Sequence, residues 1–332
     1  MSFVVNGADW RFDKATADEI QRTIERFLAF VDEAMELGQI VSIGDEFQTM
    51  PMRGELALWD LLGPNADVTM PGELRQEMAA WLGRARLYLD EDEWPAGFDN
   101  TMVAIGEAAA ISNPDVAWVH HKIRAAIPSA CITLGSAHVL ETVTAEGSAS
   151  VHFLCDGRSR REFWREAIII EGDNAASLQR HAERAYPDLH FAEGALDGLS
   201  NLSGGYLAAR HEVRKTFAAL DDGGAWAFTC PPPAKTQGEA PPPDPEARPT
   251  NQLIQTRFAG LGLDVAPEKP NVGSNRDCRI ARETTIGNRT LYCHWHVRLE
   301  PHRNRIHIHE PVPENGDRLV VGMIAEHLPL PA

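Results

Sequence analysis

Two stretches near the end of the chain alternate between apolar and polar residues with a period of two. The first covers residues 290–299 and the second covers residues 303–309. Such alternation is typical of a β-strand with one buried face. The connection between them, 300–302, is short enough to predict a β-hairpin.

The polar residues of this hairpin fall into cross-strand pairs. One register places like residues opposite one another, with their side chains on one face of the sheet: Arg298 with Arg305, His296 with His307, and His294 with His309. Neighbours of this kind lie roughly 4.5–5.5 Å apart at their β-carbons. Tyr292 extends the same face, and we expect that face to be left to solvent or to a partner.

The rest of the pattern predicts an α+β protein. A helix is expected over 17–37, because Thr16 and Glu19 form a capping-box pattern and an apolar stripe follows. Residues 100–155 are rich in β-branched residues and turn formers, which predicts an antiparallel sheet of strands joined by turns. The last part of the chain is expected to be an antiparallel meander that packs on a helix, with these segments: helix 251–260, and strands 281–286, 290–299, 303–309 and 317–324.

A proline-rich segment predicts how the chain divides into domains. Residues 231–250 contain eight prolines, a composition typical of a semi-rigid, extended linker. We therefore expect an acidic α+β region over 1–230, which can be divided further near 155, and a His/Arg-rich antiparallel β domain over 251–332.

The negative charge is unevenly distributed. The whole chain has 31 Lys/Arg and 48 Asp/Glu, a net charge of −17. Residues 251–332 hold 10 Lys/Arg and 9 Asp/Glu, so residues 1–250 hold the remaining 21 and 39. An acidic surface repels phosphate backbones. We therefore expect RNA or a ribosome to approach only through the C-terminal domain, and a protein partner to use the acidic region.

Cysteine usage and hydropathy indicate the compartment. The five cysteines are scattered, with no Cys-x-x-Cys pair, which argues against a disulfide framework and a thiolate zinc site. No run of 18 apolar residues occurs, and the first residues lack the pattern of a secretory signal. These features predict a cytoplasmic protein with no membrane partner.

The leading functional hypothesis is an RNA-directed, ribonuclease-like site on the C-terminal sheet. Paired imidazoles can act as general base and acid in transfer to a 2′-hydroxyl, so no metal or other cofactor is required. Arginines suit phosphate and a tyrosine can stack on a base. The catalytic candidates are His294, His296, His307 and His309, and the substrate-binding candidates are Tyr292, Arg298, Arg303 and Arg305.

Two alternatives remain open, and whether the protein is an enzyme at all is undecided by the sequence. In one, the His/Arg face is a non-catalytic interaction or scaffold surface that docks a partner or the acidic region of the same chain. In the other, His294, His296 and a histidine of the facing strand hold the metal of a hydrolase. Arg298 and Arg305 oppose a cation on that face.

Residues 160–332 resemble a family of uncharacterised bacterial proteins, which implies no established activity. The motifs that carry this resemblance are 163–168, 185–191, 204–206, 220–222, 270–275, 293–296, 300–307 and 326–329. The final meander also resembles the small sheet of RelE/ParE-like toxins, although it has no lysine on these strands. That resemblance implies an mRNA- or ribosome-directed ribonuclease of a bacterial toxin or phage-defence protein.

Overall fold

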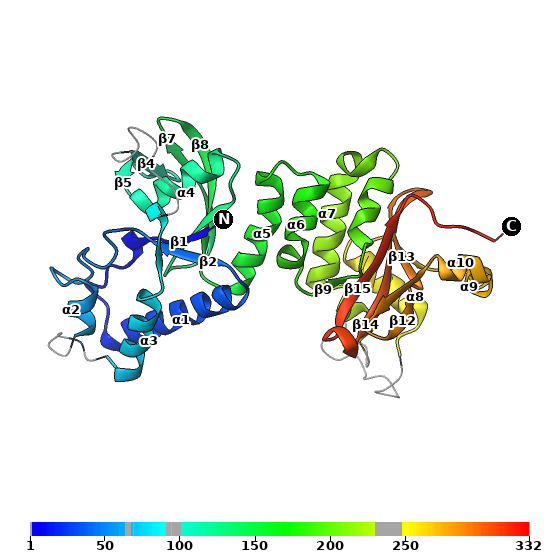
Figure 1. The fold of residues 1–332 in the computed structure, drawn as a ribbon, viewed down its shortest axis with the longest axis horizontal. Coiled ribbons are helices and arrows are strands. Elements are labelled where there is room, and N and C mark those ends of the chain that lie inside the picture. The colour runs from blue at the N-terminus through cyan, green and yellow to red at the C-terminus, as the bar shows by residue number, and fades with distance from the viewer. Residues whose placement is uncertain are drawn as a thin grey trace. The chain divides into compact units, whose positions relative to one another are not determined.

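The computed structural model describes residues 2–63, 68, 70–90, 94, 101–229 and 248–331. The chain forms two compact units, Met1–Gly172 (unit 1) and Asp173–Ala332 (unit 2). Both combine helices with β-sheets, which confirms the predicted α+β class (Figure 1). No helix that lies within the described ranges is long and apolar enough to cross a membrane.

Unit 1 is built on an eight-stranded sheet with the order β3-β2-β1-β6-β8-β7-β4-β5. Neighbours from β3 to β8 pair in parallel, and the neighbours from β8 to β5 pair antiparallel. The strands are β1 (Ser2–Val5), β2 (Ile40–Ile43), β3 (Arg86–Leu87), β4 (Met102–Ile105), β5 (Ile111–Ser112), β6 (Ser129–Ile132), β7 (His138–Thr144) and β8 (Gly147–Leu154).

The parallel half of this sheet differs from the expectation of a purely antiparallel sheet over 100–155. All four residues of β6 are buried, so the strand lacks the alternation that marks a one-sided sheet. A continuously buried strand is typical of a parallel sheet, and this short apolar run carries no signal of its direction. The β7–β8 hairpin is antiparallel as predicted.

The helices of unit 1 begin with α1 (Ala17–Glu36). The predicted capping box is present: Glu19 N donates to Thr16 Oγ1, and the backbone N of Thr16 donates to the Glu19 carboxylate. Its apolar stripe is buried, including Ile20, Ile24 and Phe27. The other helical segments are η1 (Gly7–Asp9), α2 (Leu58–Leu62), α3 (Gly72–Leu82), η2 (Tyr88–Asp90), α4 (Pro114–Arg124) and α5 (Gly157–Ile170).

Unit 2 is built on a five-stranded sheet with the order β10-β13-β14-β15-β9. Its strands are β9 (Leu189–Phe191), β10 (Val265–Pro267), β13 (Trp295–Glu300), β14 (Arg303–Val312) and β15 (Arg318–Ala325), and β11 (Glu283–Ile286) and β12 (Arg289–Tyr292) form a separate two-stranded sheet. The helical segments are α6 (Ala175–Ala185), η3 (Ala195–Asn201), α7 (Gly205–Gly223), η4 (Ala225–Phe228), α8 (Asn251–Gly260), α9 (Pro270–Ser274), α10 (Arg276–Ile280) and η5 (Pro313–Asn315).

The apolar face of this sheet packs on helices, as predicted. Trp295 of β13 contacts Phe228 with ring centroids 6.0 Å apart, and Phe228 contacts Phe258 of α8 at 5.5 Å. Phe217 of α7 packs on Phe191 of β9 at 5.2 Å. Because side chains alternate along a strand, Trp295 on the helix-covered face leaves its neighbour His296 on the other face.

The boundary between the units is not where the proline-rich segment predicted it. The short strand β9 pairs in parallel with β15, so residues from Asp173 onward belong with the C-terminal sheet. The division lies between Gly172 and Asp173, instead of near residue 230 or 155. Most of the predicted linker 231–250 lies outside the described residues, namely 231–247.

A close backbone approach in unit 2 leads to a stability prediction. A β-carbon at Gly198 of η3 would overlap the backbone carbonyl oxygen of Ile324 in β15. Gly198→Ala should therefore lower the free energy of unfolding by about 1–3 kcal/mol, as overpacked substitutions do. Gly260→Ala is the control, since a β-carbon there meets nothing within 4 Å. Urea unfolding that gave equal stabilities for the two variants would contradict this packing.

Candidate metal centre

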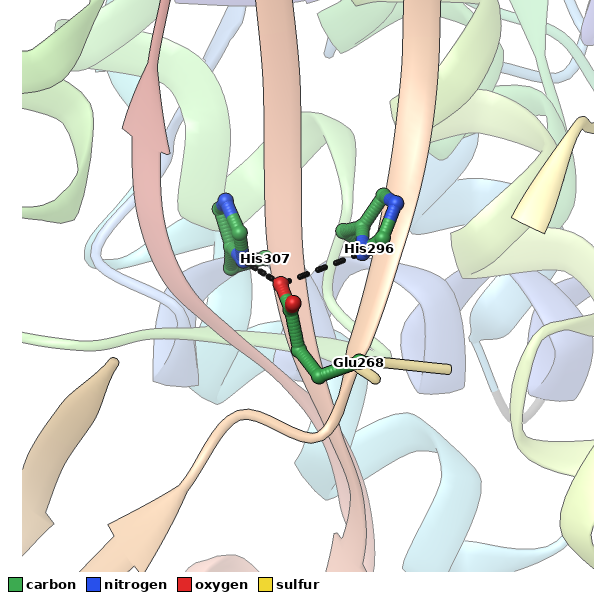
Figure 2. Close-up of side chains that lie close together, drawn as sticks. All are labelled: Glu268, His296 and His307. Atoms are coloured by element: carbon green, nitrogen blue, oxygen red, sulfur yellow. Dashed lines mark ion pairs between the residues drawn. The ribbon is translucent and has the colours of Figure 1, made fainter. Parts of the chain in front are cut away.

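The side chains of Glu268, His296 and His307 lie close together (Figure 2). Because side chains alternate along β13, this cluster is on the face of the unit 2 sheet opposite Trp295. His296 lies on β13 and His307 lies directly across from it on β14. Glu268 follows the last residue of β10, and its backbone N donates to the carbonyl oxygen of His294 at 2.7 Å. That hydrogen bond fixes the carboxylate beside the two imidazoles.

The carboxylate of Glu268 lies between the two rings. Its Oε1 is 3.2 Å from His296 Nδ1 and 3.5 Å from His307 Nδ1. The ring centroids are 5.6 Å apart, and the three ligand atoms all lie within 4.8 Å of one another. Two ligands that each lie roughly 2.0–2.1 Å from a tetrahedral zinc ion are about 3.3–3.4 Å apart, so both oxygen–nitrogen separations fit such an ion.

The cluster is almost completely buried. The exposed fraction is 0% for His307, 6% for His296 and 7% for Glu268. Yet Glu268 Oε1, His296 Nδ1 and both ring nitrogens of His307 have no hydrogen-bond partner of good geometry among the described residues. Buried polar atoms are normally satisfied, and an unsatisfied group requires an explanation such as an ion.

Arg282 is a fourth polar side chain at the cluster. Its exposed fraction is 0%, and its Nε lies 2.9 Å from Glu268 Oε1. Its Nη1 donates to the carbonyl oxygens of Cys278 at 2.8 Å and Pro329 at 3.0 Å. The guanidinium holds the carboxylate in place. Its positive charge also opposes a cation beside the carboxylate, so the cluster suits an ion that is bound chiefly by the imidazole nitrogens.

Two of the three side chains, Glu268 and His307, have the protonation state of a metal ligand at neutral pH. Burial by itself would raise the pKa of Glu268, but hydrogen bonding and charge from His296 and Arg282 outweigh it and lower this pKa to about 2. Burial lowers the pKa of His307 to about 3. At neutral pH the carboxylate is therefore ionised and the His307 imidazole is neutral, as metal ligands must be.

A cavity of about 700 Å³ lies against the cluster, and Glu268 and His296 both line it. This volume lies within the range of small-molecule sites. Its remaining lining is mostly polar or charged and includes Asp264, Lys269, Arg298, Glu300, His302, Arg305 and His327. The cavity therefore adjoins two of the three residues of the cluster.

The structure divides the four predicted catalytic histidines into two pairs. The register is as predicted for His296 with His307 and for Arg298 with Arg305. His294, however, precedes β13, and with His309 it lines a different cavity of about 760 Å³, together with Trp295. The prediction of one solvent-facing surface with all four histidines is therefore wrong, and His296 and His307 are buried.

Two local features cause this division. The run 290–299 is not one strand, because β12 ends at Tyr292 and β13 begins at Trp295. Leu291 packs with Ile286, Val312 and Val320 in a cluster of its own. On the other side, β14 has register shifts after His307 and after His309, which interrupt its alternation.

The predicted substrate-binding residues are also separated. Tyr292 ends β12, and its hydroxyl is buried without a hydrogen-bond partner. Arg303 is paired with Glu300 at 2.7 Å and does not line the cavity of the cluster. Only Arg298 and Arg305 line it. Sequence reasoning missed Glu268 and Arg282, since neither lies in the hairpin.

Comparisons with known proteins give no guide to this centre. No protein-family model matches the chain, and neither a curated protein nor a solved structure matches it at a significant level. The resemblances to an uncharacterised bacterial family and to RelE/ParE-like toxins stay predictions. The proposal below depends on the geometry of unit 2 alone.

The lowered pKa of His307 predicts an acid sensitivity in metal-free protein. A histidine in the unfolded chain binds a proton near pH 6.5, whereas His307 in the folded state binds one only near pH 3. The contribution of neutral His307 to stability is therefore present above pH 6.5 and is lost as the pH falls toward 3. Between pH 6.5 and 4.5 the loss should be about 2 kcal/mol. Urea unfolding at both values, with His307→Phe as reference, measures it. Equal pH dependence in both proteins would contradict a neutral, buried His307.

Proposed function

We propose that unit 2 binds a divalent transition-metal ion, with zinc the first to test, through Glu268, His296 and His307. The observation that carries this is the spacing of 3.2 and 3.5 Å between the carboxylate oxygen and two imidazole nitrogens that have no other hydrogen-bond partner. Two histidines and one glutamate are the ligand set of several hydrolytic zinc sites.

The chemistry that follows is hydrolysis of a substrate in the adjoining cavity. A metal ion held by these three residues would act as a Lewis acid and would lower the pKa of a water molecule at the site. In hydrolysis, a water oxygen bonds to the electrophilic atom of the substrate, the bond to the leaving group breaks, and a water proton passes to that group. Glu268 and His296 would hold the ion, and both line the cavity.

A metal-independent ribonuclease is less well supported by this geometry. It needs a histidine that is protonated near neutral pH to act as the acid. Burial lowers the pKa of His307 to about 3, which leaves this imidazole uncharged. His294 and His309 line another cavity. Of the four histidines, His296 is then the one that combines access to the cavity with a carboxylate partner.

Zinc-dependent hydrolysis is the test of this proposal. Protein dialysed against a chelator is assayed with nitrophenyl acetate, a nitrophenyl phosphate monoester and a bis-nitrophenyl phosphate diester, with and without added zinc. We expect at least one ester to be hydrolysed only with zinc, and chelator to remove that activity. Rates that stay at background with all three esters, or that zinc leaves unchanged, would refute the hydrolase.

A further inference from the structure

Arg305 lies at the edge of the cluster of Glu268, His296 and His307 and forms no ion pair with a described residue. It has no carboxylate within 4 Å in the described part of the chain, and its Nε is buried without a hydrogen-bond partner. Its polar contact is between Nη1 and His327 Nε2 at 3.4 Å. Its cross-strand neighbour is Arg298, and like charges directly opposite each other are unfavourable.

The carboxylates that line the cavity do not supply the missing charge, because each is engaged elsewhere. Asp264 pairs with Arg298 at 3.3 Å, Glu300 with Arg303 at 2.7 Å, and Glu268 with Arg282 at 2.9 Å. Lys269 also lines the cavity, is exposed, and has no described carboxylate within 4 Å. Lys269 and Arg305 are therefore the two cations of the cavity lining that form no ion pair with a described carboxylate.

We propose that Arg305 binds the phosphoryl group of a small phosphate-ester substrate, with Lys269 as a second cation. A guanidinium presents two parallel N–H donors, which match two oxygens of a phosphoryl group. Two cations and a metal ion suit a multiply charged phosphate better than a single carboxylate. The cavity volume of about 700 Å³ limits the substrate to a molecule about the size of a nucleotide.

This inference rests on the proposed hydrolytic function and specifies its substrate class. In the reaction, the water oxygen forms a bond to phosphorus and the ester P–O bond breaks. One water proton goes to the departing alcohol oxygen, and the products are an alcohol and phosphate. Arg305 holds the phosphoryl oxygens and leaves the attack to the centre at Glu268, His296 and His307.

Phosphate binding can be measured separately from metal binding. Calorimetry with inorganic phosphate is done on metal-free full-length protein, for the wild type, Arg305→Gln and Arg305→Lys. We expect Arg305→Gln to weaken phosphate binding about tenfold or more, and Arg305→Lys to lose less, because it keeps the charge but not the paired donors. Arg289→Gln is the matched control, since Arg289 is paired with Glu314 at 2.9 Å and neither residue lines the cavity, and it should bind phosphate like the wild type.

The outcomes separate the two proposals. Zinc affinity should be the same in Arg305→Gln and the wild type, because Arg305 is not a ligand. If phosphate binds through Arg305 but zinc does not bind, the metal centre fails and the anion site stands. If zinc binds but Arg305→Gln leaves phosphate affinity unchanged, or if acetate binds as tightly as phosphate, the phosphoryl assignment is overturned.

Discussion

Replacing His307 with phenylalanine is expected to lower the affinity of the protein for zinc by at least about 100-fold. Loss of an outer partner of a metal ligand already costs about 10–100-fold, so loss of a ligand itself should cost more. Phenylalanine keeps a planar ring and removes both unpartnered ring nitrogens from a fully buried position. The metal-free variant should therefore fold as stably as the metal-free wild type at neutral pH.

The measurement is competition for zinc against a chromophoric chelator. His302→Asn is the matched control, because His302 lines the same cavity but is exposed and stands outside the cluster. Asparagine also tolerates the positive φ of 68° at this position. Unchanged zinc affinity in His307→Phe, or an equal loss in His302→Asn, would remove His307 from the ligand set.

Replacing Glu268 with alanine is expected to be the most destabilising single change at the cluster. Removing one partner of a buried ion pair costs about 3–5 kcal/mol, because the other charge stays buried without compensation. Arg282 would be left in that state with an exposed fraction of 0%. Its hydrogen bonds to the carbonyl oxygens of Cys278 and Pro329 remain, so we expect a value near the lower end of this range.

A double-mutant cycle identifies the cause of this loss. Urea unfolding of metal-free Glu268→Ala, Arg282→Met and the double variant should show that the second substitution restores part of the stability lost in the first. Glu314→Ala is the control, because Glu314 pairs with Arg289 at 2.9 Å on the surface and should lose little. Strict additivity of the two buried substitutions would contradict a coupled pair.

The sequence predicted local structure well where local signals decide it. The capping box at Thr16 and Glu19 begins α1, because both hydrogen bonds form between residues three positions apart. The register of β13 with β14 follows from the short hairpin and the two alternating runs. These features predicted that His296 and His307, two of the three residues of the candidate site, lie opposite each other.

The position of Glu268, the third residue of the site, depends on packing between distant parts of the chain. Glu268 reaches His296 because β10 pairs with β13. The three residues of β10 carry no pattern that indicates this partner strand. Cys293 is fully buried, and its sulfur occupies the space where a side chain at Gly322 would lie. Cys293 lies between β12 and β13, where the run 290–299 divides, and Gly322 lies in β15. Alternation alone could not reveal this contact.

The domain boundary shows the same limit. The proline-rich segment is the strongest change in composition along the chain, so it was interpreted as the division between domains. A three-residue strand, β9, decides otherwise by pairing with β15. So short a strand carries too little pattern to predict its partner.

X-ray absorption at the zinc edge tests the metal centre most directly. Full-length protein loaded with one equivalent of zinc should show a shell of nitrogen and oxygen at roughly 2.0–2.1 Å, with the outer-shell scattering of two imidazoles per zinc. The spectrum of His307→Phe should lose one imidazole or show no bound zinc. A wild-type spectrum without imidazole scattering, or with sulfur ligands, would contradict a site made of Glu268, His296 and His307.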